Sequence, residues 1–421
     1  MIRTLLAMLM IGFFVKTNAQ IIANDSVSLN AGNTEMVYYN LATGQKTTTS
    51  NTDWHIAVTA RASQFPSAPL GGTTIRINEA NGVHVYYVPN ASAATFNAVD
   101  TTGFASWSQL HDSDTAMDEG ALNSNRNKAN FFDFGWGVYN QSSHNVVGDS
   151  VYVFTLPGGG VKKLLVESLV YDTAFIITYT DIDNSNPQTL HIRKADYPGK
   201  NFVYVNMLTN QVLDKEPANN TWDIQFLKYA ALDVLPDSAY PVVGVWSNKS
   251  ANIARRTGVE STSNDNTGLS YSRRLNTIGW NWKYYDFQNN AYQVEDSLSY
   301  FIQTYGGLEY KLVFTGYTGS STGVISFYKE ALNATAINEL PATGLTSVYP
   351  NPVSDLLQVN FNTAAQRQME VVDLSGRLVY QSTTNQQTAQ IPVADMPAGV
   401  YLLAVKQTGA APAISKFIVA K

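Results

Sequence analysis

Histidine is the residue type in this chain with the clearest capacity to bind a metal. All five histidines lie before residue 198, and they are His55, His84, His111, His144 and His191. Neutral imidazole nitrogens bind transition metals, including iron, so these residues are the first candidates for a ligand site. The chain has no cysteine, which excludes disulfides, thiolate metal sites and cysteine nucleophiles.

Three of the histidines lie in segments that alternate like β-strands. His84 in "VHVYYV" and His191 in "LHIRK" alternate with apolar residues, so we expect both to face solvent. In "NTDWHIAV", Trp54 and Ile56 share one face of the predicted strand and His55 lies on the other. The pattern therefore predicts that His55 is exposed as well.

Other motifs do not indicate catalysis. The acidic segments 112–120 and 181–186 have oxygen ligands that would suit Ca²⁺, but Ala116 and Met117 interrupt the first and the second lacks a glycine. We interpret both as turns, and "LPGGGVKK" as a hairpin loop. The chain contains no H-E-x-x-H. We predict that the protein is not an enzyme.

Composition favours an all-β fold. The chain has 421 residues, 44% of them hydrophobic, with 24 Tyr, 18 Phe and 7 Trp, and aromatic residues favour strands. Only 14% of residues are charged, and no sustained helical periodicity follows the N-terminus. The net charge of −6, without a basic stripe, argues against nucleic acid as a partner.

The first 19 residues have the pattern of a secretory signal peptide. Arg3 precedes an apolar run over 5–15, and "TNA" ends in a small residue at Ala19, where we expect cleavage. The run is shorter than the roughly 20 residues that a membrane span needs. The mature protein is therefore predicted to be exported.

The next part of the chain contains an internal repeat. "VYYNLATGQ" (37–45) matches "VYVNMLTNQ" (203–211), "NTDWHIAV" matches "NNTWDIQF", and 148–166 resembles 295–314. Three matches in one order predict two tandem β domains, at 20–198 and 199–332. In the second copy we expect Asp223 and Gln225 to face solvent, and alignment places Ala291 opposite His144.

The C-terminal part is predicted to be a separate module. Residues 333–347 are small and polar and read as a linker. Residues 348–421 contain several short alternating segments after Pro350 and Pro352, which predicts an Ig-like β-sandwich.

This module resembles the type A C-terminal sorting domain of the type IX secretion system. The matching pieces are "VYPNPVSDLLQV", "VVDLSGRLVY", "MPAGVYLLAV" and "KFIVAK". The resemblance implies a bacterium of the Bacteroidetes type and the type IX machinery as a partner. It also implies that the protein is secreted or held at the outer-membrane surface, where attachment to lipopolysaccharide is an option.

The two repeats resemble the HmuY-like haem-binding family. The resemblance rests on "VYYNLATG", "NTDWHIAV", "IRIN", "WGVYNQSSHNVV" and "VYVFTLPGGGVKKLLV" in the first copy. It implies haem, free or from haemoproteins, held by two histidines from neighbouring β segments. His144 falls where the family has a Thr-His pair, and His111 is the candidate second iron ligand. Trp107, Trp136 and Tyr139 are candidates for packing on the porphyrin.

Three functions follow as alternatives. The first is a secreted or surface-attached, non-enzymatic haem-binding protein that uses His111 and His144. The second is a structural or adhesive surface protein without haem, which the lack of histidine in the second copy favours there. The third is a secreted hydrolase acting on glycans or peptides.

Overall fold

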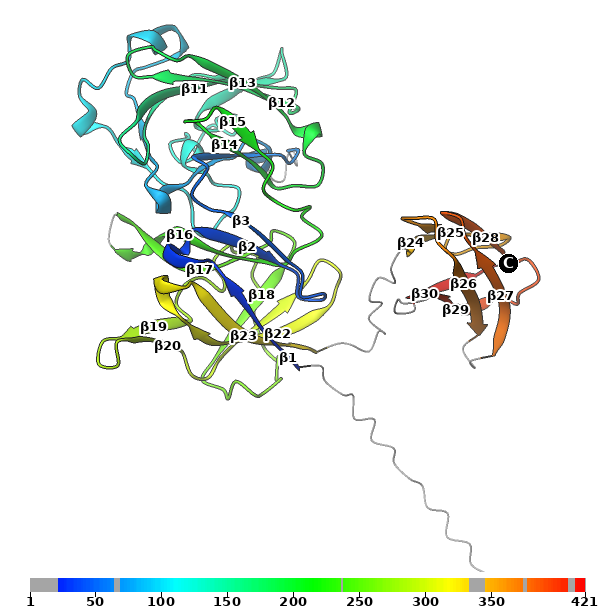
Figure 1. Ribbon diagram of the computed structural model, residues 1–421. Helices are drawn as coiled ribbons and strands as arrows, with labels where there is room; N and C mark the ends of the chain where they lie inside the picture. The colour runs from blue at the N-terminus through cyan, green and yellow to red at the C-terminus, as the bar shows by residue number, and fades with distance from the viewer. Residues whose placement is uncertain are drawn as a thin grey trace, which may run out of the picture. The chain divides into compact units, whose positions relative to one another are not determined.

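The computed structural model describes residues 22–63, 69–235, 238–332, 345–373, 377–407 and 413–420. The chain divides into two compact units, 1–333 and 334–421 (Figure 1). The predicted signal peptide lies outside the described residues. The described structure is strands joined by loops and 3₁₀ helices of three to six residues, which confirms the all-β prediction. No helix in the described part of the chain is both long and apolar enough to cross a membrane.

The first unit contains two β-sandwiches. Sandwich one, residues 56–213, has a small sheet in the order β15-β14-β4-β5 and a large sheet in the order β13-β12-β11-β10-β6-β7. The β8–β9 hairpin extends the large sheet by pairing with β11. The strands are β4 (Ile56–Thr59), β5 (Ile75–Ile77), β6 (His84–Tyr87), β7 (Gln109–Leu110), β8 (Gly137–Asn140), β9 (Asn145–Gly148), β10 (Val151–Thr155), β11 (Val161–Val170), β12 (Ala174–Asp181), β13 (Gln188–Arg193), β14 (Phe202–Asn206) and β15 (Gln211–Leu213).

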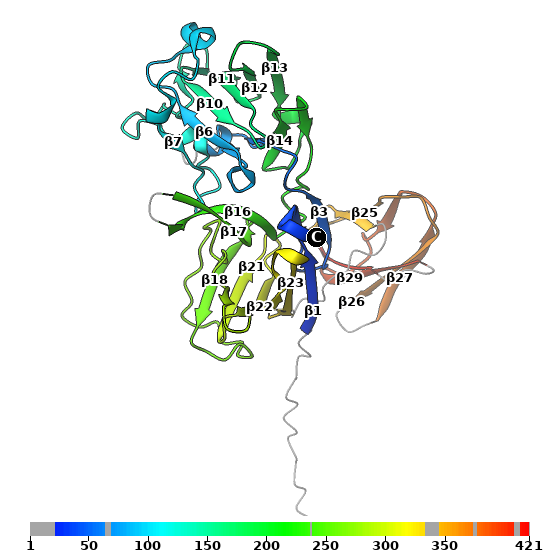
Figure 2. The ribbon, with the colours of Figure 1, turned by 60° about the vertical axis from the view of Figure 1, so that its left-hand side comes forward.

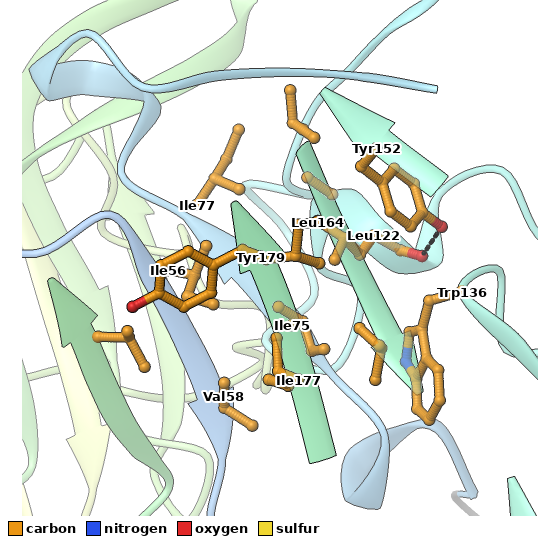
Figure 3. Close-up of a cluster of buried hydrophobic side chains, with 14 of the residues drawn as sticks. Ile56, Val58, Ile75, Ile77, Leu122, Trp136, Tyr152, Leu164, Ile177 and Tyr179 are labelled. Atoms are coloured by element: carbon orange, nitrogen blue, oxygen red, sulfur yellow. Dashed lines mark hydrogen bonds between the residues drawn. The ribbon is translucent and has the colours of Figure 1, made fainter. Parts of the chain in front are cut away.

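The core of sandwich one lies between these two sheets. Figure 3 shows Ile56, Val58 and Ile75 of the small sheet facing Ile177 and other side chains of the large sheet. Alternation explains this arrangement, because every second side chain of a strand points to the same face.

Sandwich two combines the start of the unit with its end. Its small sheet has the order β17-β16-β2-β3 and its large sheet the order β1-β23-β22-β21-β18. The strands are β1 (Ile22–Ser28), β2 (Glu35–Tyr39), β3 (Lys46–Ser50), β16 (Ile224–Leu235), β17 (Ser238–Ser247), β18 (Asn252–Thr257), β19 (Lys283–Asp286), β20 (Ala291–Val294), β21 (Leu298–Gln303), β22 (Glu309–Tyr317) and β23 (Val324–Ala331). In Figures 1 and 2 the blue β1 to β3 lie among the green and yellow strands of this sandwich.

In the structure one repeat runs from β1 to β12 and the other from β13 to β23, and the two repeats exchange their first three strands. The order β15-β14-β4-β5 corresponds to β3-β2-β16-β17, and β13-β12-β11-β10-β6 corresponds to β1-β23-β22-β21-β18. Hairpin β2–β3 therefore pairs with the Trp-Asp-Ile strand of the second repeat, with Tyr39 opposite Ile224. Hairpin β14–β15 pairs with the first repeat, with Val205 opposite Ile56. The sandwiches consequently span 56–213 and 22–50 plus 224–331, which differs from the predicted domains 20–198 and 199–332.

The small sheets pack against each other and join the two sandwiches. Trp54 and Trp222 lie in this interface, whereas the strands that follow them point Ile56 and Ile224 into the two separate cores. The hydroxyl groups of Tyr38 and Tyr204 meet across it at 2.9 Å. The predicted common core face of Trp54 and Ile56 was therefore wrong, because β4 begins only at Ile56 and the chain turns before it.

The prediction that His55, Asp223 and Gln225 face solvent was also wrong, because all three are buried. His55 Nδ1 accepts a hydrogen bond from the Met207 backbone N–H at 2.9 Å. Burial lowers the pKa of His55 to about 4, so this ring is neutral at pH 7. The sheet face that the sequence pattern assigns to solvent is covered here by the small sheet of the other sandwich.

The second unit is a β-sandwich by itself. Its sheets have the orders β24-β25-β28 and β27-β26-β29-β30, and its core includes Leu357, Val371, Leu403 and Phe417. Residues 345–347 of the predicted linker belong to its first strand. The strands are β24 (Leu345–Tyr349), β25 (Leu356–Phe361), β26 (Arg367–Asp373), β27 (Leu378–Thr384), β28 (Thr388–Pro392), β29 (Gly399–Lys406) and β30 (Ala413–Val419).

Candidate functional site

His111 is bound to a buried carboxylate. It follows β7, and its Nδ1 lies 2.6 Å from Glu79 Oε1. The Glu79 side chain is 5% exposed, and its hydrogen bond raises the pKa of His111. The neighbouring histidine is His84 on β6, whose Nδ1 is 4.0 Å from the same oxygen. Gln109 Nε2 lies between Glu79 and His84. It donates a hydrogen bond to Glu79 Oε1 and lies 3.3 Å from His84 Nδ1.

His144 lies at the turn of the β8–β9 hairpin. Its backbone has φ 56°, a left-handed conformation, and its N–H donates to the Asn140 carbonyl at 2.8 Å. Its Nδ1 lies 2.9 Å from the Tyr139 hydroxyl. The imidazole ring centroid is 6.5 Å from that of Tyr171, which follows β11.

The structure does not bring His111 and His144 together. His111 follows Leu110, which pairs with Val85, so the position of His111 lies opposite His84. His84 pairs with Thr155 of β10, and Thr155 pairs with Val161 at the start of β11. His144 contacts Tyr171, ten positions further along the same strand direction. At ~3.3 Å per residue this places them on the order of 30 Å apart along the sheet. These two residues therefore do not fit a haem held by two histidines.

The aromatic residues predicted to pack on porphyrin are also dispersed. Trp136 is fully buried in the core and donates its indole N–H to the Thr73 carbonyl. Trp107 packs edge-on against Phe104. Of the three predicted aromatic residues, Tyr139 is the one in contact with a predicted ligand.

A cavity of about 320 Å³ opens beside His144. This hairpin pocket one has predominantly aromatic and aliphatic walls, and its volume is at the lower end of the range for small-molecule sites. The lining residues are Ser63, Thr73, Phe132, Phe134, Tyr139, His144, Val146, Leu169, Tyr171 and Asp172. The sequence signal for this cavity is the aromatic density of "ANFFDFGWGVY" at residues 129–139.

The carboxylate in this pocket is already paired. Asp172 forms an ion pair with Lys194 and accepts a hydrogen bond from the Ser63 N–H at 2.6 Å. Lys194 also donates to the Gly72 carbonyl at 2.7 Å. Hairpin pocket one therefore presents aromatic rings, hydroxyls and one imidazole to a ligand, with its acidic group neutralised.

The carboxylates of the two acidic segments, 112–120 and 181–186, form hydrogen bonds within the protein. Asp112 is buried and accepts hydrogen bonds from the backbone N–H groups of Ile77 and Ala121. Asp181 accepts from Lys162 and Asn186. Across the described residues, no three His, Asp or Glu side chains are grouped to hold a metal ion.

Comparison with known protein families identifies the C-terminal unit. Residues 347–420 match the family described as the secretion system C-terminal sorting domain. Among curated proteins, none matches the chain. The second unit is thus a type IX C-terminal sorting domain, and it marks the chain for export as a secreted or cell-surface protein.

Solved structures share only distant similarity with this chain. PorZ, a surface component of the type IX secretion system of Porphyromonas gingivalis, is 12% identical over 67% of this chain and 44% of its own, with a TM-score of 0.17. Dimeric latent PorU of the same organism is 10% identical over 66% and 32%, also with 0.17. A biofilm-associated protein BSP domain is 9% identical over 95% and 81%, again with 0.17. The chain spans less than half the length of the first two proteins, and these scores carry no functional argument.

Proposed function

We propose that this exported protein is a non-enzymatic binding protein and that hairpin pocket one holds a saccharide. The observation that carries this proposal is the turn after β11. Tyr171 and Asp172 have φ 48° and 55°, although left-handed positions in two-residue turns favour Asn and Gly. A bulky residue there costs roughly 1–2 kcal/mol. Strained backbone conformations of this kind concentrate at functional positions. Here the left-handed turn places the Tyr171 side chain at the pocket rim, where it is 63% exposed.

The composition of the pocket suits a neutral sugar. A sugar ring has an apolar C–H face and a hydroxyl edge, and tyrosine matches both because its ring is apolar and its hydroxyl forms hydrogen bonds. Tyr139 and Tyr171 supply such rings, and Phe132 stacks on Tyr139 with centroids 5.7 Å apart. Since Asp172 is neutralised by Lys194, the described lining residues offer no unpaired carboxylate to an ionic ligand.

Calorimetry with neutral hexasaccharides of glucose, mannose and galactose tests this proposal. Tyr171→Ala should weaken binding at least tenfold, because it removes the exposed ring at the rim. Tyr305→Ala is the matched control, since Tyr305 is 69% exposed and does not line the pocket. Equal affinity together with an equal number of sites in the two variants would contradict the proposed site.

Haem capture by His144 alone is a second candidate. The Tyr139 hydroxyl engages Nδ1, which leaves Nε2 as the ring nitrogen for a ligand, and iron-binding imidazoles are commonly oriented through their other nitrogen. A haemin titration should then show a saturable absorbance shift that His144→Ala abolishes and His111→Ala preserves. The same loss in both variants, or no shift in the wild type, would exclude this candidate.

A further inference from the structure

Sandwich two has a second cavity at the place that corresponds to hairpin pocket one. It opens beside the β19–β20 hairpin and measures about 310 Å³. Six aromatic side chains line this hairpin pocket two, together with Lys228 and Lys283, and no carboxylate is among its described lining residues. The six are Tyr240, Trp280, Tyr284, Tyr285, Tyr292 and Tyr317.

The two hairpins have the same internal hydrogen bonds. Tyr285 donates to Asn290 Oδ1, as Tyr139 contacts His144 five positions later. Asn290 has φ 50°, close to the 56° of His144. The structural counterpart of His144 is therefore Asn290, and the sequence alignment that placed Ala291 there was wrong by one residue.

Asn140 and Asp286, at the start of the two hairpin turns, also accept equivalent hydrogen bonds. The Asn140 side-chain oxygen accepts the backbone N–H groups two and three positions later, at 2.9 and 3.0 Å. Asp286 Oδ1 does the same at 2.9 and 3.2 Å. What the two pockets share is thus an aromatic hairpin of one geometry, and the imidazole is particular to pocket one.

The ammonium group in pocket two is engaged by the protein. Lys283 Nζ donates to the carbonyls of Val243 and Trp280 at 2.5 and 3.3 Å. It also lies 5.0 Å from the centroid of the Tyr317 ring. Burial lowers the pKa of Lys283 to about 7, which further reduces its charge. The half-buried Lys228 is the other cation of the lining.

The aromatic surface, by contrast, is open to solvent. Tyr284 and Tyr240 are 50% and 47% exposed, and Tyr292 is 38% exposed. Soluble proteins seldom expose clustered large apolar side chains unless the surface binds something. Because the rings are tyrosines, the surface offers hydroxyl groups along with apolar faces.

We infer that hairpin pocket two is a second binding site for a neutral saccharide, so that each chain carries two sites of one class. This inference rests on the function proposed for hairpin pocket one. The exchange of strands between the repeats keeps both hairpins in one compact unit. A ligand with repeating sugar units fits such duplication better than a single small molecule does.

Stoichiometry in the full mature chain tests the inference. Calorimetry with the best-binding neutral hexasaccharide should give two sites per chain in the wild type and in Tyr305→Ala. Tyr240→Ala combined with Tyr284→Ala should remove one site, and Tyr171→Ala should remove the other. Tyr240→Phe with Tyr284→Phe keeps the rings and should retain two sites, which separates loss of binding from loss of fold.

The possible failures are distinguishable. One site in the wild type, lost with Tyr171→Ala and unaffected by the double alanine variant, overturns the second site and leaves the proposed function standing. One site lost only with the double alanine variant overturns pocket one and supports pocket two. Absence of binding to all three hexasaccharides overturns both.

Discussion

His55 and Asp223 accept the same hydrogen bond in the two sandwiches. His55 Nδ1 receives the Met207 N–H at 2.9 Å, and Asp223 Oδ2 receives the Leu41 N–H at 2.8 Å. Met207 and Leu41 follow equivalent hairpin strands from the opposite repeat. Both side chains were predicted to face solvent, but each is a buried acceptor that ties its Trp strand to the exchanged hairpin.

The Asp223 acceptor should be required for stability. We expect Asp223→Ala to lower the free energy of unfolding by about 1–3 kcal/mol, because it leaves the buried Leu41 N–H without its partner. Asp223→Asn keeps an acceptor oxygen and should cost less. Urea denaturation monitored by tryptophan fluorescence measures both, and equal losses would show that the hydrogen bond is not the cause.

Glu216 should make stability depend on pH. Burial raises its pKa to about 7, although the N–H groups of Asn201 and Phe202 oppose this shift. A raised folded-state pKa contributes stability that is complete below the unfolded value of 4.5 and is lost as pH rises to about 7. Over that window the wild type should lose on the order of 2–3 kcal/mol relative to Glu216→Gln. Urea unfolding of both proteins at pH 4.5, 6 and 8 measures the difference, and parallel curves would contradict the shift.

The exchange of strands should be visible in fragments. Residues 20–198 lack β14 and β15, so this fragment should not unfold cooperatively on heating. Mixing it with 199–332 should restore cooperative unfolding, because 20–198 supplies β1, β2 and β3 to sandwich two and 199–332 supplies β14 and β15 to sandwich one. A fragment of residues 51–216 contains all strands of sandwich one, and we expect it to unfold cooperatively by itself. Cooperative unfolding of 20–198 by itself would rule out the exchange.

Tyr171 should lower the free energy of unfolding and strengthen saccharide binding. Asparagine adopts φ near 48° at a lower cost than tyrosine, so Tyr171→Asn should raise the free energy of unfolding by about 1 kcal/mol. The same change removes the ring from hairpin pocket one and should weaken saccharide binding at least tenfold. Thermal unfolding and calorimetry give the two readouts. A variant that gains stability and keeps its affinity would show that the strained turn has another role.

The sorting domain should control export. Deletion of residues 334–421 removes the whole second unit and should leave the truncated protein inside the outer membrane of the producing bacterium. The buried Leu403→Asp variant should act in the same way, because an unpaired charge in that core unfolds the unit. Immunoblots of cell and medium fractions measure this, and normal delivery of the truncated chain would contradict a sorting role.

The sequence by itself determined the strands, the repeat and the C-terminal module. Alternation in segments such as Ile56–Thr59 and Leu356–Phe361 specifies which side chains share a face, and this information is local. The sorting-domain motifs are equally local, since each lies within a dozen consecutive residues.

Only the tertiary structure decided which strands pair and where the histidines lie. Both hairpins at 35–50 and 202–213 offer nearly the same residues to either Trp strand, so no local pattern specifies the partner. For the same reason, proximity in sequence could not show that His111 meets Glu79 or that His144 meets Tyr171. Side chains far apart in the chain become neighbours through sheet order, and sheet order depends on the packing of the whole unit.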